Sequence, residues 1–294
     1  MKIYRTRQLM ADGDLPDPQP REDVESLKRR LAALSLSFAS EALADLINQA
    51  VKEKLGPPAF LDLILRWELQ RAEERRIKQA LKISHLPMGY TISNFDFSFQ
   101  PSVARSKIET LATCSWIAQK ETLLLQGPPG VGKTHLCTAL GVRAVETGFS
   151  VSFYRLDELL HQLKRDAHLS PSRLKHKKYN ASMLMIIDEM GFQPLTVEEA
   201  HLLFRVINYR YGRGAIALTT NKSISQWPQM LAGDEVLASA ILDRLLQACH
   251  VLNIRGRSYR LKDLEDELHR RPEFNGPKTG MDVDPDKLET PKEE

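Results

Sequence analysis

The chain has 294 residues, of which 42% are hydrophobic and 27% are charged, and its formal net charge is +3. This composition is close to the globular average and excludes collagen, wholesale disorder and a small disulfide-stapled fold. No apolar run reaches the roughly 18 residues that a membrane span needs, and the first residues lack the apolar core of a secretory signal. The three cysteines are far apart and form no CxxC pair, so a cytoplasmic protein without a metal cage is expected.

The N-terminal part of the chain predicts a small all-α domain at residues 23–84. Residues 1–22 are rich in proline, aspartate and arginine and are expected to form a flexible arm. Apolar residues then recur with the period of a helix from residue 24 to residue 51. Gly56 and the two prolines after it end this pattern, and a second helix is expected at about residues 59–81.

An irregular linker is expected at residues 85–104, where alternating phenylalanines predict an extended segment or a short strand. After it, short apolar strands alternate with helical segments. The expected strands are TLLLQ at 122–126, VSFYR at 151–155, MLMII at 183–187, AIALTT at 215–220 and HVLNIR at 250–255. This alternation predicts an α/β domain at residues 105–271, with a mostly parallel sheet covered by helices on both faces. The acidic tail at 272–294 is expected to be disordered.

The most specific motif is a glycine-rich loop between the first expected strand and a helix. The sequence GPPGVGKT matches GxxxxGK[ST] in the strand–loop–helix context that this motif requires. Its backbone N–H groups and the helix N-terminus suit phosphate oxygens, with Lys133 on the β- and γ-phosphates and Thr134 on Mg²⁺. The motif therefore predicts ATP and Mg²⁺ as cofactors. The expected nucleotide-binding residues are Gly127, Pro128, Pro129, Gly130, Val131, Gly132, Lys133, Thr134 and His135, although His135 is expected chiefly to pack.

An acidic pair, Asp188 and Glu189, directly follows the expected strand MLMII. Asp188 is placed to hold Mg²⁺, and Glu189 is placed to orient and polarise the attacking water. Adjacent Asp and Glu favour an ATPase over a small-molecule kinase. The alternative interpretation is a plain acidic turn after a strand.

Three further polar residues are candidates for catalysis. Asn221 follows the strand AIALTT, where its amide is suited to sense the γ-phosphate or position water, or simply to cap the strand. Arg244 and Arg260 are candidates for the cation that stabilises charge on the transferred phosphoryl group. Taken alone, each arginine also fits an ordinary surface salt bridge.

From about residue 24 to residue 271 the chain closely resembles the IstB-like transposition helper ATPases, AAA+ proteins related to DnaC-type helicase loaders. The resemblance rests on GPPGVGKTHL at 127–136, MIIDEMGFQPL at 185–195, TTNKSISQW at 219–227 and GDEVLASAILDRLLQACHVLNIRGRSYRLK at 233–262. The linker segment FDFSFQPS at 95–102 is similar as well. Met183 departs from the family pattern, in which an acidic residue often begins the strand.

This resemblance implies an AAA+ P-loop core of three α/β/α layers, preceded by the all-α domain. It also implies ATP-dependent assembly on double-stranded DNA, recruitment or stimulation of a transposase, and hydrolysis that resets the complex. By position, Asn221 matches sensor 1 and Arg260 matches a sensor-2-like arginine of the same subunit. Arg244 matches the arginine finger that reaches the ATP of a neighbouring subunit in a homo-oligomer.

A basic segment lies between the second and third expected strands. In such ATPases this region can face a central channel, which implies sequence-independent contact with the DNA backbone. A solvated basic helix end is the alternative. The residues expected to bind DNA are Lys164, Arg165, Arg173, Lys175, Lys177 and Lys178.

Other functions share parts of this pattern. A DnaC-type replicative helicase loader has the same ATPase core and differs in what its N-terminal helices bind. A DNA-binding scaffold with a degraded ATPase is opposed by the intact Lys133, Thr134, Asp188 and Glu189. A metabolite kinase is opposed by the basic segment and by the Asp-Glu pair.

Overall fold

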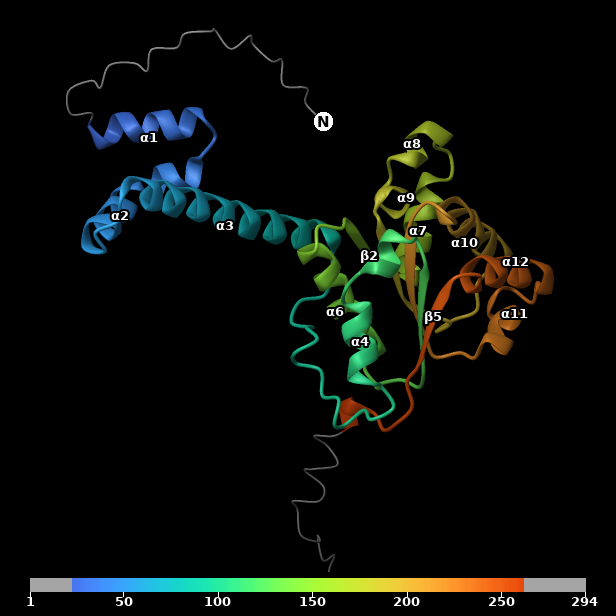
Figure 1. Ribbon diagram of the computed structural model, residues 1–294. Coiled ribbons are helices and arrows are strands. Elements are labelled where there is room, and N and C mark those ends of the chain that lie inside the picture. Colours follow the sequence, from blue (N-terminus) through green and yellow to red (C-terminus); the bar gives the residue numbers. More distant parts are fainter. Residues whose placement is uncertain (1–22, 262–294) are drawn as a thin grey trace, which may run out of the picture. The chain divides into compact units, whose positions relative to one another are not determined.

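The computed structural model describes residues 23–261, and the contacts among them form two compact units that divide after Ala80 (Figure 1). The expected N-terminal arm at 1–22 and the expected tail at 272–294 lie outside the described residues. The domain bounds expected from the sequence stay predictions. Among the described residues, no helix is long and apolar enough to cross a membrane.

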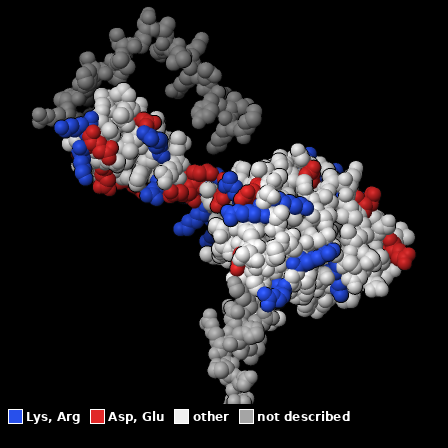
Figure 2. All heavy atoms as spheres, turned by 60° about the horizontal axis from the view of Figure 1, so that its bottom comes forward, with Lys and Arg blue, Asp and Glu red and all other residues white. Residues whose placement is uncertain are grey.

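The first unit is made of helices only: α1 (Val24–Ala33), α2 (Ser37–Lys52) and the start of α3 (Pro57–Ser84). The single helix expected from residue 24 to residue 51 is wrong, because the chain turns at Ser35, whose φ is 65°. Ala39, Leu43 and Leu46 of α2 form the core with Ile64 of α3. Basic and acidic side chains are intermixed along these helices (Figure 2).

A buried carboxylate joins two of these helices. The Glu68 side chain of α3 is only 7% exposed, and its Oε2 accepts a hydrogen bond of 2.7 Å from the backbone N–H of Ala39. Ala39 lies in the first turn of α2, where backbone N–H groups have no partner within the helix. Since α2 has no side-chain cap of its own, Glu68 supplies the missing acceptor and the negative charge that a helix N-terminus favours.

The second unit is built on a five-stranded parallel sheet with the strand order β2-β3-β4-β1-β5. The strands are β1 (Thr122–Gln126), β2 (Val151–Arg155), β3 (Leu184–Met190), β4 (Ala215–Thr220) and β5 (Cys249–Asn253). The strands β1 to β4 are buried along nearly their whole length, as expected for parallel strands covered on both faces, whereas β5 is only partly buried. The sheet and its flanking helices confirm the fold class predicted from the sequence.

Helices cover both faces of this sheet (Figure 1). On one face, α6 packs closely enough that a Cβ added at Gly141 would lie 2.8 Å from Cδ1 of Ile186. On the other, the neighbouring strand residues Met185 and Ile187 join the large core cluster with α7, α10, α11 and α12. The helices are α4 (Arg105–Leu111), α5 (Ser115–Ala118), α6 (Lys133–Glu146), α7 (Leu156–Asp166), α8 (Pro171–Lys175), α9 (Lys178–Ala181), α10 (Val197–Arg210), α11 (Trp227–Met230) and α12 (Glu235–Leu246), with short 3₁₀ helices η1 (Ile224–Gln226) and η2 (Tyr259–Leu261).

Two expectations about local structure are corrected. The segment at 85–104 forms turns and no strand, and Phe95 within it is buried. The strand expected to end at Ile187 continues to Met190, with a register shift against β4 between these two residues. Glu189 lies at this irregularity with a φ of 60°, a backbone conformation that is uncommon for a residue other than glycine. The register irregularity therefore lies at the acidic pair, where Asp188 is buried and Glu189 is exposed near the carboxyl end of β3.

Candidate nucleotide-binding site

The glycine-rich loop connects β1 to α6 and requires glycine at two positions. Gly132, the residue before α6, has a φ of 94°, and a Cβ there would lie 2.6 Å from Cε2 of Phe95. Gly130 has a φ of 80°, and a Cβ there would overlap the Ser258 side chain. Both residues combine a left-handed backbone with no room for a side chain. The loop therefore presents backbone N–H groups at a helix N-terminus, which is a favourable environment for an anion.

Lys133 folds back over this loop. Its Nζ donates hydrogen bonds of 2.8 Å and 2.7 Å to the carbonyl oxygens of Gly127 and Pro128. The pKa of Lys133 is lowered, chiefly because the side chain is partly buried. The Asp188 carboxylate raises this pKa, and the positive charge of Arg260 lowers it further. An anion between Lys133 and Arg260 would relieve the repulsion between these two cations, and a triphosphate supplies such an anion.

Asp188 is the best-connected side chain of the site. It is 4% exposed, and its Oδ1 and Oδ2 lie 2.9 Å and 3.0 Å from Oγ1 of Thr134. The hydroxyl of Thr219 also donates to the Asp188 carboxylate and accepts a 3.0 Å hydrogen bond from the backbone N–H of Glu189. A buried carboxylate beside a threonine hydroxyl, next to a phosphate-binding loop, is a donor set that suits Mg²⁺, which prefers oxygen ligands and keeps substrate phosphates among them.

Glu189 lies at the rim of the same pocket, and its Oε2 forms a 2.7 Å ion pair with Nη2 of Arg155. Arg155 is the last residue of β2 and lies opposite Asp188 in the sheet register. Neither Arg155 nor Thr219 was among the residues predicted from the sequence. Their position at the ends of strands that neighbour the acidic strand was the only signal that pointed to them.

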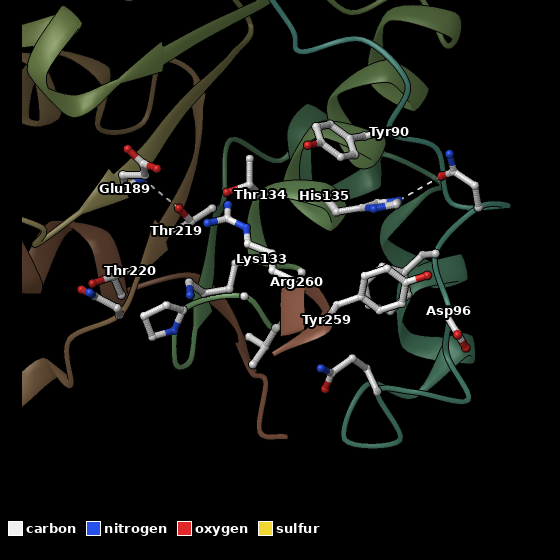
Figure 3. Close-up of a pocket in the computed structure, with 18 of the residues that line it drawn as sticks. Tyr90, Asp96, Lys133, Thr134, His135, Glu189, Thr219, Thr220, Tyr259 and Arg260 are labelled. Atoms are coloured by element: carbon white, nitrogen blue, oxygen red, sulfur yellow. Dashed lines mark hydrogen bonds between the residues drawn. The ribbon is translucent and has the colours of Figure 1, made fainter. Parts of the chain in front are cut away.

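The pocket has a volume of about 320 Å³ and extends from Glu189 to the linker (Figure 3). Lys133, Thr134 and Arg260 lie at its centre, with Glu189 and Thr219 toward one side. Its lining residues are Tyr90, Asn94, Phe95, Asp96, Gln100, Pro129, Gly130, Val131, Gly132, Lys133, Thr134, His135, Glu189, Phe192, Thr219, Thr220, Asn221, Tyr259 and Arg260.

The far side of the pocket is aromatic and comes largely from the linker. The ring centroid of His135 lies 4.9 Å from that of Tyr90 and 5.2 Å from that of Phe95. Its Nε2 lies 2.9 Å from the carbonyl oxygen of Thr91 and 3.0 Å from Oδ1 of Asn94. His135 thus packs, as expected, and also fixes the linker against the loop. Flat, apolar walls beside a phosphate-binding loop suit a nucleobase. Of the alternating phenylalanines of the linker, Phe95 lines the pocket, and the sequence did not predict this wall.

The structure brings most of the predicted catalytic residues together and leaves one apart. Asn221 and Arg260 line the pocket with Lys133 and Glu189, and Asp188 lies behind the lining residue Thr134, within hydrogen-bond distance of its hydroxyl. Arg244 is not among the lining residues. It donates hydrogen bonds of 2.8 Å to Oδ1 of Asn208 and to the carbonyl oxygen of Ala240, and it lies 5.0 Å above the Phe204 ring.

The six predicted DNA-binding side chains differ in their surroundings. Lys164 pairs with Glu199 at 2.8 Å, and Lys177 pairs with the buried Asp166 at 2.8 Å. Lys178 donates to a backbone carbonyl. The remaining three side chains are exposed and, like Lys178, have no carboxylate partner within residues 23–261: Arg165, Arg173 and Lys175.

This geometry places the chain among the P-loop nucleotide-binding proteins. Comparison with known families gives the particular group. The model of the family described as IstB-like ATP binding protein matches residues 29–266, so the chain belongs to that family.

Individual relatives agree with this assignment. An insertion sequence IS21 putative ATP-binding protein of Pseudomonas aeruginosa is 41% identical over 82% of this chain and 89% of its own length. An insertion sequence IS5376 putative ATP-binding protein of Geobacillus stearothermophilus is 38% identical over 81% of this chain and 95% of its own length.

Among solved structures, the DnaC helicase loader is 21% identical with a TM-score of 0.48, covering 56% of this chain and 96% of that one. AMPPCP-bound DnaA from Aquifex aeolicus is 20% identical with a TM-score of 0.47, covering 63% and 56%.

Proposed function

We propose that this protein is an ATP-hydrolysing helper of transposition that assembles on double-stranded DNA and recruits or stimulates a transposase. The observation that carries the proposal is the arrangement of Asp188 and Glu189 beside the phosphate-binding loop in a member of a family whose relatives are named after insertion sequences. Phosphate binding alone needs no second carboxylate, whereas hydrolysis needs a group that polarises water.

Each residue of the pocket has a role in this proposal. The loop N–H groups and Lys133 bind the β- and γ-phosphates. Thr134 and Asp188 would hold Mg²⁺, which would supply positive charge to stabilise the phosphates. Glu189 accepts the proton of the attacking water. Asn221 orients that water or senses the γ-phosphate, and Arg260 stabilises the phosphoryl charge from within the subunit.

Arg244 completes the site in a neighbouring copy of the chain. Its side chain lies outside its own pocket and is held against α10 by Asn208 and Phe204. A neighbour's triphosphate is a stronger partner for a guanidinium than the neutral amide of Asn208. In the proposal, ATP bound to one subunit draws Arg244 of the next into place, so that ATP binding promotes the homo-oligomer.

The exposed cations of the α7–α9 segment are the proposed DNA contacts. Since Lys164 and Lys177 already have carboxylate partners, Arg165, Arg173 and Lys175 are the side chains best suited to replace counterions on phosphates. Changing these three to glutamate should weaken binding to two unrelated duplexes alike and flatten the salt dependence of binding. If the variant and the wild type show equal slopes of log K against log salt, these three side chains do not contact DNA.

The helper role itself is tested by capture. Purified protein with ATP and DNA is presented with a transposase and, separately, with a replicative helicase from the same cell. The proposal expects ATP-dependent retention of the transposase by wild type and no retention by Lys133→Ala protein. Retention of the helicase alone would establish a helicase loader and refute the transposition role.

A further inference from the structure

Two stretches without any acidic residue meet at the amino end of the sheet. Residues 167–187 and 200–233 contain no aspartate or glutamate. The first stretch leads through α9 into β3, and the second leads through α10 and the turn at 211–214 into β4. Leu184 and Ala215 are partners in the parallel pairing of β3 and β4. Both stretches therefore reach the same end of the sheet, where these strands begin.

Arg210, at the end of α10, holds these two stretches together. It is fully buried, and its guanidinium donates to the carbonyl oxygens of Ser182 at 2.9 Å, Ala215 at 2.7 Å and Tyr179 at 3.1 Å. Burial lowers the pKa of Arg210 to about 10, so the group keeps its charge at neutral pH. The turn before β4 is thus fixed to the α9 segment and adds positive charge beneath it.

The exposed side chains at this corner are basic and aromatic. Arg213 lies 4.9 Å above the Tyr209 ring and donates a 2.7 Å hydrogen bond to the Tyr209 carbonyl oxygen. Tyr211 is 45% exposed. Arg205 is exposed on α10. Burial is the largest effect on the pKa of Tyr179 in α9 and raises it, whereas the nearby charge of Arg205 lowers it. We refer to this surface as the α10–β4 surface; its residues are Arg205, Tyr209, Tyr211 and Arg213.

This surface differs from an ordinary solvated charged face. On the N-terminal helices, basic side chains form ion pairs with acids three or four residues away: Lys28 with Glu25, Arg66 with Asp62, Arg71 with Glu74 and Arg76 with Glu73. Neither Arg205 nor Arg213 has a carboxylate partner in the described part of the chain. Arginines without carboxylate partners, together with the buried Arg210, produce a positive potential that favours an external anion.

We propose that the α10–β4 surface binds the phosphate backbone of double-stranded DNA, as a continuation of the contact made by the exposed cations of α8. The proposal rests on the DNA-binding function proposed above and adds residues that the basic segment does not contain. The guanidinium of Arg213 is held in place by Tyr209 and keeps N–H donors free for a phosphate oxygen. The Tyr211 hydroxyl is suited to donate to a second phosphate, a contact that carries no sequence information.

A salt titration of duplex binding tests this proposal. The variant is Arg205→Glu with Arg213→Glu, and the control is Arg66→Glu with Arg143→Glu, an equal charge change at arginines that already pair with Asp62 and Glu146. If each arginine contacts one phosphate, the slope of log K against log salt should become shallower by about 1.8 in the variant. The control slope should stay at the wild-type value.

Tyr211 gives an independent arm of the experiment. Tyr211→Phe keeps the ring and removes the hydroxyl, so it should weaken binding to two unrelated duplexes by the same factor and leave ATP binding intact. Equal slopes for the arginine variant and wild type, or an equal loss in variant and control, would overturn the proposal. Loss of ATP-dependent assembly with an unchanged DNA slope would overturn it as well and make the surface a subunit contact. Wild-type protein without salt-dependent DNA binding would instead refute the proposed DNA function as a whole.

Discussion

Nη2 of Arg155 lies 2.7 Å from Oε2 of Glu189, and this ion pair joins the carboxyl ends of the neighbouring strands β2 and β3. The Arg155 and Glu189 side chains are 52% and 43% exposed. An ion pair with this exposure is worth at most about 1 kcal/mol. Glu189, which we propose as the catalytic base, is therefore held only weakly by Arg155. In this arrangement Arg155 competes with the attacking water for the lone pairs of the Glu189 carboxylate.

Removing this partner should release the base. Arg155→Ala is expected to raise the basal rate of ATP hydrolysis by up to about fivefold, the factor that corresponds to about 1 kcal/mol. Arg155→Lys keeps a charge but loses the planar fork, so its rate should lie between those of wild type and Arg155→Ala. Steady-state phosphate release without DNA measures all three. A lower rate for Arg155→Ala would mean that Arg155 positions Glu189 productively.

Lys133 should be essential for tight nucleotide binding. In the structure its ammonium satisfies two loop carbonyls, and with ATP it is expected to bind the phosphates. Lys133→Ala should therefore abolish tight ATP binding in a fluorescent nucleotide titration, whereas Lys52→Ala, at the exposed end of α2, should bind as wild type does. Unchanged affinity of the Lys133→Ala protein would remove the phosphate-binding assignment of the loop.

Arg244 should act on the neighbouring subunit. Arg244→Ala is expected to leave ATP binding by the isolated subunit nearly unchanged and to lower hydrolysis by a factor of about 10³ or more, the contribution of an arginine supplied in trans. Mixing this variant with Lys133→Ala protein should restore part of the activity, since one partner supplies the pocket and the other the arginine. No rescue at any mixing ratio would place the action of Arg244 within its own subunit.

The sequence predicted the parts of this molecule that local patterns encode. The strands at 122–126, 151–155 and 215–220 agree with the structure residue for residue, because parallel strands buried on both faces are short, mostly apolar runs. The loop and the acidic pair were also predictable, since their chemistry requires fixed residue types at fixed spacing.

Contacts between distant segments were not predictable in the same way. Arg155 and Thr219 belong to the site only because β2 and β4 flank β3 in the sheet order, and strand order has no local signature. The linker wall around Tyr90 and His135 joins segments about forty residues apart. The break at Ser35 was missed because the apolar period continues through it, although the backbone turns.

The central claim is that this site hydrolyses ATP through Glu189. The most direct measurement compares wild type and Glu189→Gln for ATP binding and phosphate release in the same samples. Glutamine keeps the shape of the side chain and leaves Thr134 and Asp188 untouched, but it cannot accept the proton of water. We predict equal ATP affinity, persistence of bound ATP and longer-lived DNA complexes for Glu189→Gln, with phosphate released by wild type alone. Phosphate release by Glu189→Gln at the wild-type rate would contradict the account.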